Sequence, residues 1–99
     1  MEAIAGILSR VLRRYGLEDQ MLGWQAVEEW SLVVGARIAR HSHAVAFREG
    51  VLRVEVEGSA WMQELGFLQR KLIQKINRHI GRDMVREIRF VIPRGGNLR

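Results

Sequence analysis

Apolar residues between Gly50 and Ile92 change their spacing twice, which predicts a strand, a long helix and a second strand. In the two outer stretches every second residue is apolar, the pattern of a strand with one buried face. In the middle, apolar residues recur every three or four positions and form one stripe along a helix. This stripe consists of Trp61, Leu65, Leu68, Leu72, Ile76 and Ile80. Because a helix joins the two strands, we expect them to be parallel.

Small residues mark where these predicted elements meet. Gly58 ends the first strand, predicted over 51–57, and Ser59 is the expected N-cap of the helix. Gly81 is expected to end the helix, because glycine readily takes the left-handed conformation found after a last helical turn. The second strand is then predicted over 85–92.

Two more helices are predicted upstream from the same three- and four-residue spacing. The first runs from about Glu2 to Tyr15 and is closed by Gly16. The second follows Asp19, its expected N-cap, and ends or bends at Gly35. Their apolar stripes consist of Ile4, Leu8, Val11 and Tyr15, and of Val27, Trp30, Val34 and Ile38.

A third strand is predicted between these helices and the segment described first. Apolar and polar residues alternate from His43 to Arg48, which places Val45 and Phe47 on one face. Glu49 and Gly50 then form a tight turn, so that this strand and the next one make a hairpin.

The predicted order of elements is therefore α-α-β-β-α-β, an α+β fold. Each strand has one apolar face, so we expect a three-stranded mixed sheet with all three helices on one side and water on the other. Ninety-nine residues suit a single domain. We assign it to residues 1–92, followed by a short flexible tail, 93–99, which we expect to fray.

Positive charge is concentrated in the second half of the chain. The formal net charge is +5 at pH 7. From Gly58 onward nine Lys and Arg face three acidic residues, whereas acids slightly outnumber bases before that point. A segment with this excess of positive charge attracts polyanions, either nucleic acid or an acidic protein surface. The alternative is that the surplus only maintains solubility.

The composition excludes several classes of protein. Cysteine is absent, which removes disulfides and thiolate metal sites. No apolar run is long enough to span a bilayer, so we expect no membrane partner. Near the start, an acid precedes the apolar residues and arginines follow them, the reverse of a secretory signal. We therefore expect a cytoplasmic protein.

Catalytic and cofactor-binding patterns are also missing. The serines have no recognisable partner spacing, and neither a nucleophile elbow nor a phosphate-binding glycine loop occurs. We expect no enzyme activity, no small-molecule substrate and no cofactor. His41 and His43 have a spacing that can chelate a metal, but His79 is the only further imidazole. Because a zinc site needs three or four convergent ligands, we expect no metal.

The long helix carries the candidate binding site. On a helical wheel several polar residues lie off its apolar stripe, with Phe67 among them. An aromatic residue on a basic face can stack on a base or anchor a protein partner. The alternative is that Phe67 packs against the first helix or the loop after it. The predicted nucleic-acid-binding residues are Arg70, Lys71, Gln74, Arg78, Arg82 and Arg86, and the predicted partner-binding residues are Phe67, Arg70 and Trp24. Trp30 and Trp61 are expected in the core.

A series of short motifs, in order and spacing, resembles the DciA family of bacterial proteins. The motifs are Trp30, Val33-Val34-Gly35, Ile38-Ala39, His41-Ser42, Gly50-Val51-Leu52, Ser59-Ala60-Trp61, Glu64-Leu65, Ile76-Asn77, Gly81 and Ile88-Arg89-Phe90. The resemblance implies a KH-like domain and a role in recruiting or loading the replicative DNA helicase. It also implies a structural position for His41. The chain departs from the family pattern at Ser42 and Ala44, where a threonine and a proline are common, and lacks the long polar tail of many members.

The resemblance favours a non-enzymatic adaptor that binds the replicative helicase and helps to place it on DNA, with weak, non-specific DNA binding. The alternative is a basic KH-like module that binds RNA or DNA without a helicase partner. The G-x-x-G loop with which nucleic-acid-binding KH domains clamp a backbone is absent, so the fold alone does not imply that activity. An enzyme with an unrecognised site is a weaker third reading. Identifying proteins captured from native lysate would separate the first two.

Overall fold

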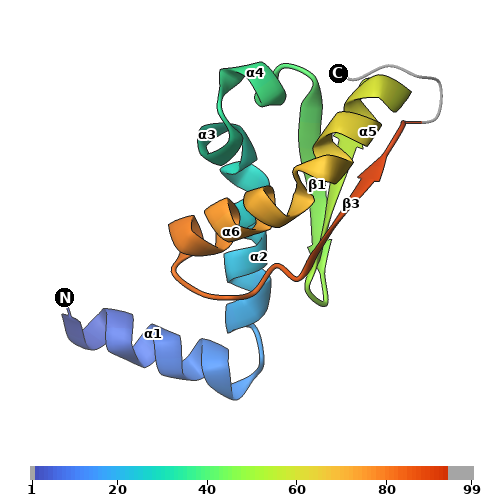
Figure 1. Ribbon diagram of the computed structural model, residues 1–99. Helices are drawn as coiled ribbons and strands as arrows, with labels where there is room; N and C mark the ends of the chain where they lie inside the picture. The colour runs from blue at the N-terminus through green and yellow to red at the C-terminus, as the bar shows by residue number, and fades with distance from the viewer. Residues whose placement is uncertain (1, 94–99) are drawn as a thin grey trace.

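The structure is a computed structural model that describes residues 2–93, apart from the side chains of residues 2, 3, 5, 9 and 12 (Figure 1). Most of the predicted tail, residues 94–99, lies outside the described residues. The elements are α1 (Glu2–Arg14), α2 (Glu18–Glu28), α3 (Trp30–Val34), α4 (Ala36–Ala39), β1 (Ser42–Arg48), β2 (Val51–Val56), α5 (Ser59–Phe67), α6 (Gln69–Ile80) and β3 (Glu87–Val91). The α+β class and the general order of elements are as predicted.

The sheet has the strand order β1-β2-β3. Strands β1 and β2 form an antiparallel hairpin, and β2 and β3 are parallel, as the crossover between them predicts. At the hairpin turn Glu49 and Gly50 have φ angles of 50° and 85°, the positive values that a two-residue turn between right-twisted strands requires. Leu52 pairs with Ile88 and Val54 with Phe90, so the apolar faces of β2 and β3 coincide.

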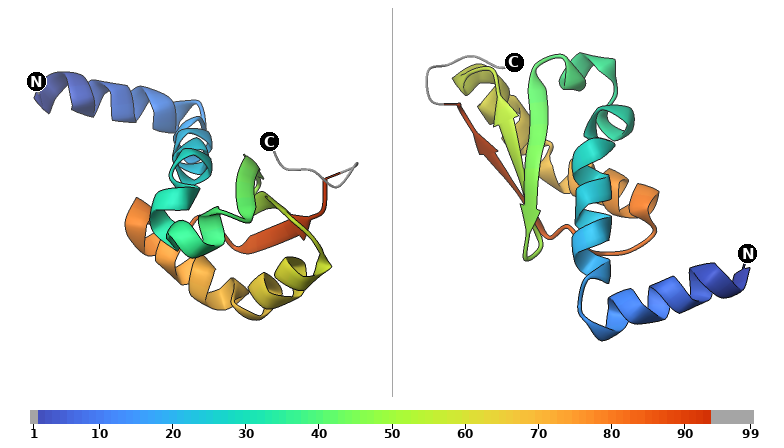
Figure 2. Two further views of the ribbon diagram at one scale, coloured as in Figure 1. Left: turned by 90° about the horizontal axis from the view of Figure 1, so that it is seen from above. Right: turned by 180° about the vertical axis from the view of Figure 1, so that it is seen from behind.

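The core lies between this sheet and helices α2 to α6, which all lie on one side of it (Figure 2). Leu52, Val54 and Val56 of the central strand are fully buried. Trp30 is also buried, and its indole Nε1 donates to Ser42 Oγ at 2.9 Å. Ser42 Oγ in turn donates to the carbonyl oxygen of Ile38 at 2.7 Å. The polar groups that enter the core at this point are therefore hydrogen-bonded.

The two long predicted helices are each interrupted. The crossover is not one helix: it breaks at Leu68 into α5 and α6. Gly66, a poor helix former, lies two residues before this break. Leu65 of α5 and Leu72 of α6 are both buried, so the helices on either side of the break each contribute to the core. The upstream helix is divided among α2, α3 and α4, and the break between α3 and α4 falls at Gly35, where φ is 89°.

Three local predictions were wrong. Gly58, not Ser59, is the N-cap residue of α5, and Leu17, not Asp19, is that of α2. In β1 a bulge between Ala44 and Ala46 shifts the pairing, so that Phe47 lies opposite Leu52 on the buried face and shares it with Ala44, not with Val45.

Helix α1 does not cover the sheet, although its apolar stripe predicted that it would. It projects from the rest of the molecule in all three views (Figures 1 and 2). The chain turns sharply after α1 at Gly16, where φ is 70°. As a result, the apolar side chains of its stripe are exposed instead of buried.

Candidate nucleic-acid and partner interface

Helix α6 presents a continuous basic face to solvent. Its opposite side is buried through Leu72, Ile76 and Asn77. The exposed side carries Arg70, Lys71, Gln74, Lys75 and Arg78, which we call the α6 basic face. Within residues 2–93, none of its four cations forms an ion pair with a carboxylate. Four neighbouring charges are thus uncompensated, which is the electrostatic footprint that favours a polyanion.

Phe67 ends α5 beside the α6 basic face. Phe67 is 82% exposed, so the alternative that it packs against the first helix or the loop after it is wrong. It lines an open hollow of about 740 Å³ together with Arg70, Gln74 and Arg86. Gly66, Gln69 and Ile73 complete the lining. The structure therefore brings the predicted aromatic residue together with three of the predicted polar ones.

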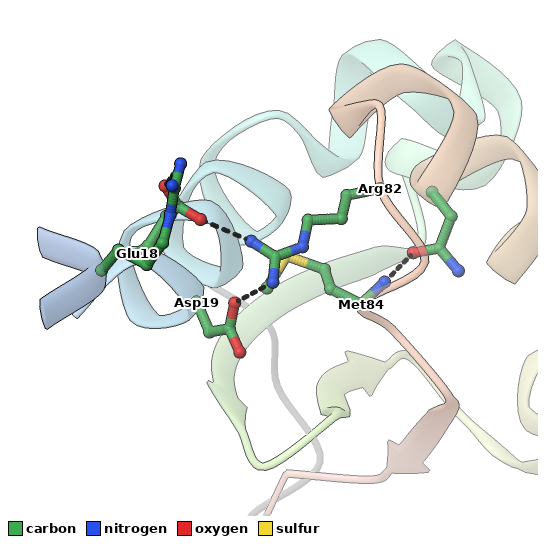
Figure 3. A network of polar contacts seen from close by, with 6 residues as sticks. Glu18, Asp19, Arg82 and Met84 are labelled. Atoms are coloured by element: carbon green, nitrogen blue, oxygen red, sulfur yellow. Dashed lines mark hydrogen bonds and ion pairs between the residues drawn. The ribbon is translucent and has the colours of Figure 1, made fainter. Parts of the chain in front are cut away.

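Arg82 lies apart from this group and has acidic partners. Its guanidinium contacts Glu18 Oε1 at 2.7 Å and Asp19 Oδ1 at 3.1 Å (Figure 3). These contacts tie the loop after α6 to the start of α2. Because two carboxylates compensate its charge, Arg82 is less available to a phosphate than the α6 basic face is.

Arg86 is exposed at the surface and also contacts the turn of the β1–β2 hairpin. One of its guanidinium nitrogens donates to the carbonyl oxygen of Glu49 at 3.0 Å. Gly50 has a φ of 85°, which favours glycine, and a Cβ there would lie 2.5 Å from Arg86 Nε and displace this guanidinium. Arg86 also lines a second hollow, and so lies between the two concave surfaces of the domain.

Trp24 lines that second hollow and is 57% exposed. The hollow measures about 740 Å³ and is bounded by α2, by the turn of the β1–β2 hairpin and by the loop before β3. Phe47 and Met84 contribute apolar walls, and charges of both signs surround them. Trp24 is therefore accessible to a partner, but it does not share the hollow of Phe67.

Asn77 has a structural role in the loop before β3 that residue spacing did not predict. It is buried, and its Nδ2 donates to the carbonyl oxygen of Val85 at 2.9 Å. Its Oδ1 accepts hydrogen bonds from the backbone N–H groups of Met84 and Val85 at 3.2 and 2.9 Å. Asn77 thus fixes the loop that carries Arg86 to the start of β3. Lys75 was missed as well, although a helical wheel places it beside Lys71 and Arg78.

Trp61 is only partly buried, whereas its position in the apolar stripe predicted a core residue. The imidazole of His41 stacks on its indole at a centroid distance of 4.5 Å, and the guanidinium of Arg37 lies 5.4 Å from the ring centroid. His41 Nδ1 also lies 3.0 Å from Glu57 Oε1, and Arg37 contacts Glu64 at 2.7 Å. His41 is thus occupied by packing and by one carboxylate.

The third histidine lies in a different cluster. His79 Nε2 is 2.6 Å from Glu29 Oε1 and links α6 to the end of α2. This hydrogen bond, with a second from Gln25, holds the pKa of the Glu29 carboxyl below its usual value. In the described part of the chain, His, Asp and Glu side chains do not form any group of three or more that could hold a metal ion.

The helices described above are all too short or too polar to cross a bilayer. This finding covers residues 2–93.

Comparison with known proteins identifies the family. The family described as "Dna[CI] antecedent, DciA" matches residues 3–90. A UPF0232 protein of Mycobacterium bovis (strain BCG) is 40% identical over 65 residues, which cover 66% of this chain and 35% of that protein. A UPF0232 protein of Mycobacterium ulcerans is 35% identical over 89 residues, with 89% and 48% covered.

A UPF0232 protein of Corynebacterium glutamicum is 26% identical over 98 residues, which cover 99% of this chain and 55% of the relative. The chain thus spans between about a third and just over half of these relatives. The family match extends from α1 into β3 and so includes almost the whole described fold. The chain belongs to the DciA family.

Proposed function

We propose that this domain is a non-enzymatic adaptor that binds the replicative DNA helicase and helps to place it on DNA. Family membership supports a role of the helicase-loader type. The observation that carries the proposal is the α6 basic face, whose four cations are uncompensated within residues 2–93, directly beside the exposed Phe67. The partners are cytoplasmic in bacteria, and we expect the domain to act there.

The basic face supports weak DNA binding without sequence preference. Arg and Lys side chains on one helix can neutralise successive phosphates and release their counterions. Reading of bases requires shape-matched polar groups directed at base edges, and this face is mainly a row of long, solvated cations. We therefore propose that the α6 basic face holds DNA near the helicase.

Phe67 supports the protein contact. An exposed aromatic side chain next to Arg70, above a hollow, has the composition of an interface hot spot. The contribution of this domain is then contact surface, and the helicase's own ATPase drives later movement. We keep Trp24 and its hollow as a second candidate contact, because its indole is also exposed.

The test is direct binding to the cognate replicative helicase, measured by interferometry without added nucleotide. Phe67→Ala should weaken binding by roughly thirtyfold, the effect of losing about 2 kcal/mol at a hot spot. Leu32→Ala is the matched control, because Leu32 is similarly exposed, at 72%, but lies on α3. Both variants should melt like the wild type, since neither side chain is in the core.

If the wild type does not bind helicase at tens of micromolar concentrations, the adaptor function fails. Retained DNA binding would then favour the alternative, a nucleic-acid-binding module without a helicase partner. If Phe67→Ala instead lowers the melting temperature while binding is unchanged, Phe67 has a structural role.

A further inference from the structure

Helix α1 has an apolar face that the domain does not cover. The side chains of Ile4, Ile7, Leu8, Val11 and Tyr15, here called the α1 stripe, are between 44% and 69% exposed. At 100° per residue they fall within an arc of about 100°, so they form one continuous strip. Arg13 lies on the opposite side of the helix, and its guanidinium contacts Glu18 at 3.7 Å. The side of α1 that carries Arg13 is therefore turned toward α2, and the stripe points away from the domain.

A helix in this situation needs a partner. Isolated helices of fewer than about 12–15 residues are marginal in water, because nucleation is costly and packing normally supplies most of their stability. Helix α1 has 13 residues and packs its apolar side against no other described element. Contiguous exposed apolar strips of this kind commonly mark interaction sites.

The charges beside the stripe indicate the chemistry of that partner. Arg10 and Arg14 lie along one margin of the stripe on the helical wheel. Among the described side chains, which do not include that of Glu2, neither is paired with a carboxylate, whereas Arg13 is. If the stripe packed against the α1 helix of a second copy, the arginines of both helices would lie close together. Repulsion between these like charges disfavours such a pairing. An anionic membrane is also a poor match, since basic lipid-binding segments generally use about four to eight Lys or Arg.

We propose that α1 is a docking helix whose stripe enters an apolar groove with carboxylates along one rim on the replicative helicase. The inference rests on the proposed function and adds a second contact to it, separate from Phe67. The mode is that of an amphipathic helix laid into a groove, with anchors spaced three and four residues apart. The groove supplies the burial that α1 lacks, and its rim carboxylates pair with Arg10 and Arg14.

The experiment compares helicase binding by the wild type, by the double variant Leu8→Ser, Val11→Ser, and by the control Leu32→Ser. The double variant should bind at least about tenfold more weakly, as expected when anchor residues are truncated. Its melting temperature should not change, because the stripe is outside the core. Hydrogen exchange gives a second readout: amides of residues 4–14 should become protected when helicase is added to the wild type and stay unprotected in the double variant.

The possible results separate this inference from the proposed function. If wild type and double variant bind helicase equally well, or residues 4–14 gain no protection, the docking helix is wrong and the adaptor function stands. If the wild type does not bind, both fail. Light scattering and co-sedimentation with phosphatidylglycerol–phosphatidylethanolamine vesicles test the other occupants. The inference is overturned if the wild type self-associates or binds vesicles, the double variant does not, and both bind helicase equally well.

Discussion

Asn77 contributes to the fold through hydrogen bonds that an apolar residue cannot make. Asn77→Ala would leave the N–H groups of Met84 and Val85 and the carbonyl of Val85 without partners in a buried loop. Each unsatisfied buried group costs about 1–3 kcal/mol, and partial access of water reduces the sum. We expect a loss of about 3 kcal/mol in the free energy of unfolding, measured by urea denaturation.

Gln74→Ala is the control for that measurement, because Gln74 lies on the exposed side of the same helix. Its effect should stay within about 0.5 kcal/mol, the range of ordinary surface substitutions. A loss below about 1 kcal/mol in Asn77→Ala would show that the loop before β3 finds other partners.

The contact between His79 and Glu29 has a consequence for pH dependence. The pKa of Glu29 is lowered by His79 first and by Gln25 second, so the folded chain binds this proton less tightly than the unfolded chain. Glu29 therefore stabilises the fold above its ordinary pKa of 4.5, and this contribution is lost as the pH falls below that value through the lowered pKa.

An NMR titration of the Glu29 carboxyl carbon checks this expectation. In His79→Ala the pKa of Glu29 should rise toward its ordinary value, because the largest cause of the shift is removed. His43→Ala is the matched control, since His43 is exposed on β1 and forms none of the ion pairs described here. An unchanged pKa in His79→Ala would mean that the contact does not persist in solution.

Single positions show the limit of sequence periodicity most clearly. Periodicity places Trp30 and Trp61 on apolar stripes alike, yet Trp30 is fully buried and Trp61 is only partly buried. Their neighbours differ. Ser42 Oγ accepts a hydrogen bond from the indole of Trp30, whereas the ring of Trp61 is contacted by the imidazole of His41 and the guanidinium of Arg37. These neighbours are distant enough in sequence that no local pattern reveals them.

At the scale of elements, the α6 basic face leads to a test of DNA binding. Reversing Arg70, Lys71 and Arg78 to Glu should abolish binding to DNA near physiological salt and leave the fold intact, because all three are exposed. For the wild type, the affinity should fall steeply with salt, by a slope of roughly −0.7 to −0.9 per neutralised phosphate. Fluorescence anisotropy with labelled oligonucleotides at several salt concentrations measures both quantities.

The control reverses an equal number of charges elsewhere, at Arg48, Arg53 and Arg89 on the open side of the sheet. All three are exposed in the strands. If this variant loses DNA binding to the same extent, net charge and not the α6 basic face determines affinity. If the first variant binds DNA as well as the wild type does, the DNA site lies on another surface.

The type of each helix or strand was easier to predict from the sequence than the points at which a helix breaks. The strands and the parallel pairing of β2 with β3 follow from residue spacing, and β3 occupies Glu87–Val91 within the predicted 85–92. The break at Leu68 could not be predicted, because the apolar stripe passes through Leu65, Leu68 and Leu72 at unbroken helical spacing. The α6 basic face was predictable from a wheel, whereas the compensation of Arg82 by Glu18 depends on a contact across 64 residues.

At the scale of the whole molecule, charge is polarised rather than merely positive. The open side of the sheet mixes signs, with Arg53 beside Arg89 and with Glu87 paired to Arg89 at 3.3 Å. The α6 basic face has only cations and one amide. The summed field therefore favours one orientation of an approaching polyanion. Sequence composition revealed the excess charge but not this direction, because the crossover helix had to be placed on the sheet first.

The parallel pairing of β2 with β3 also determines when the domain can become complete during its synthesis. Residues 57–86 separate the two strands, and a ribosome adding about 5–20 residues per second needs roughly 2 to 6 s to make them. During that interval β2 pairs only with β1, and a two-stranded hairpin is marginally stable in water. One edge of β2, with its fully buried residues Leu52 and Val54, then remains open to other nascent chains. Of the three described strands, the last to be translated is the one that closes the core.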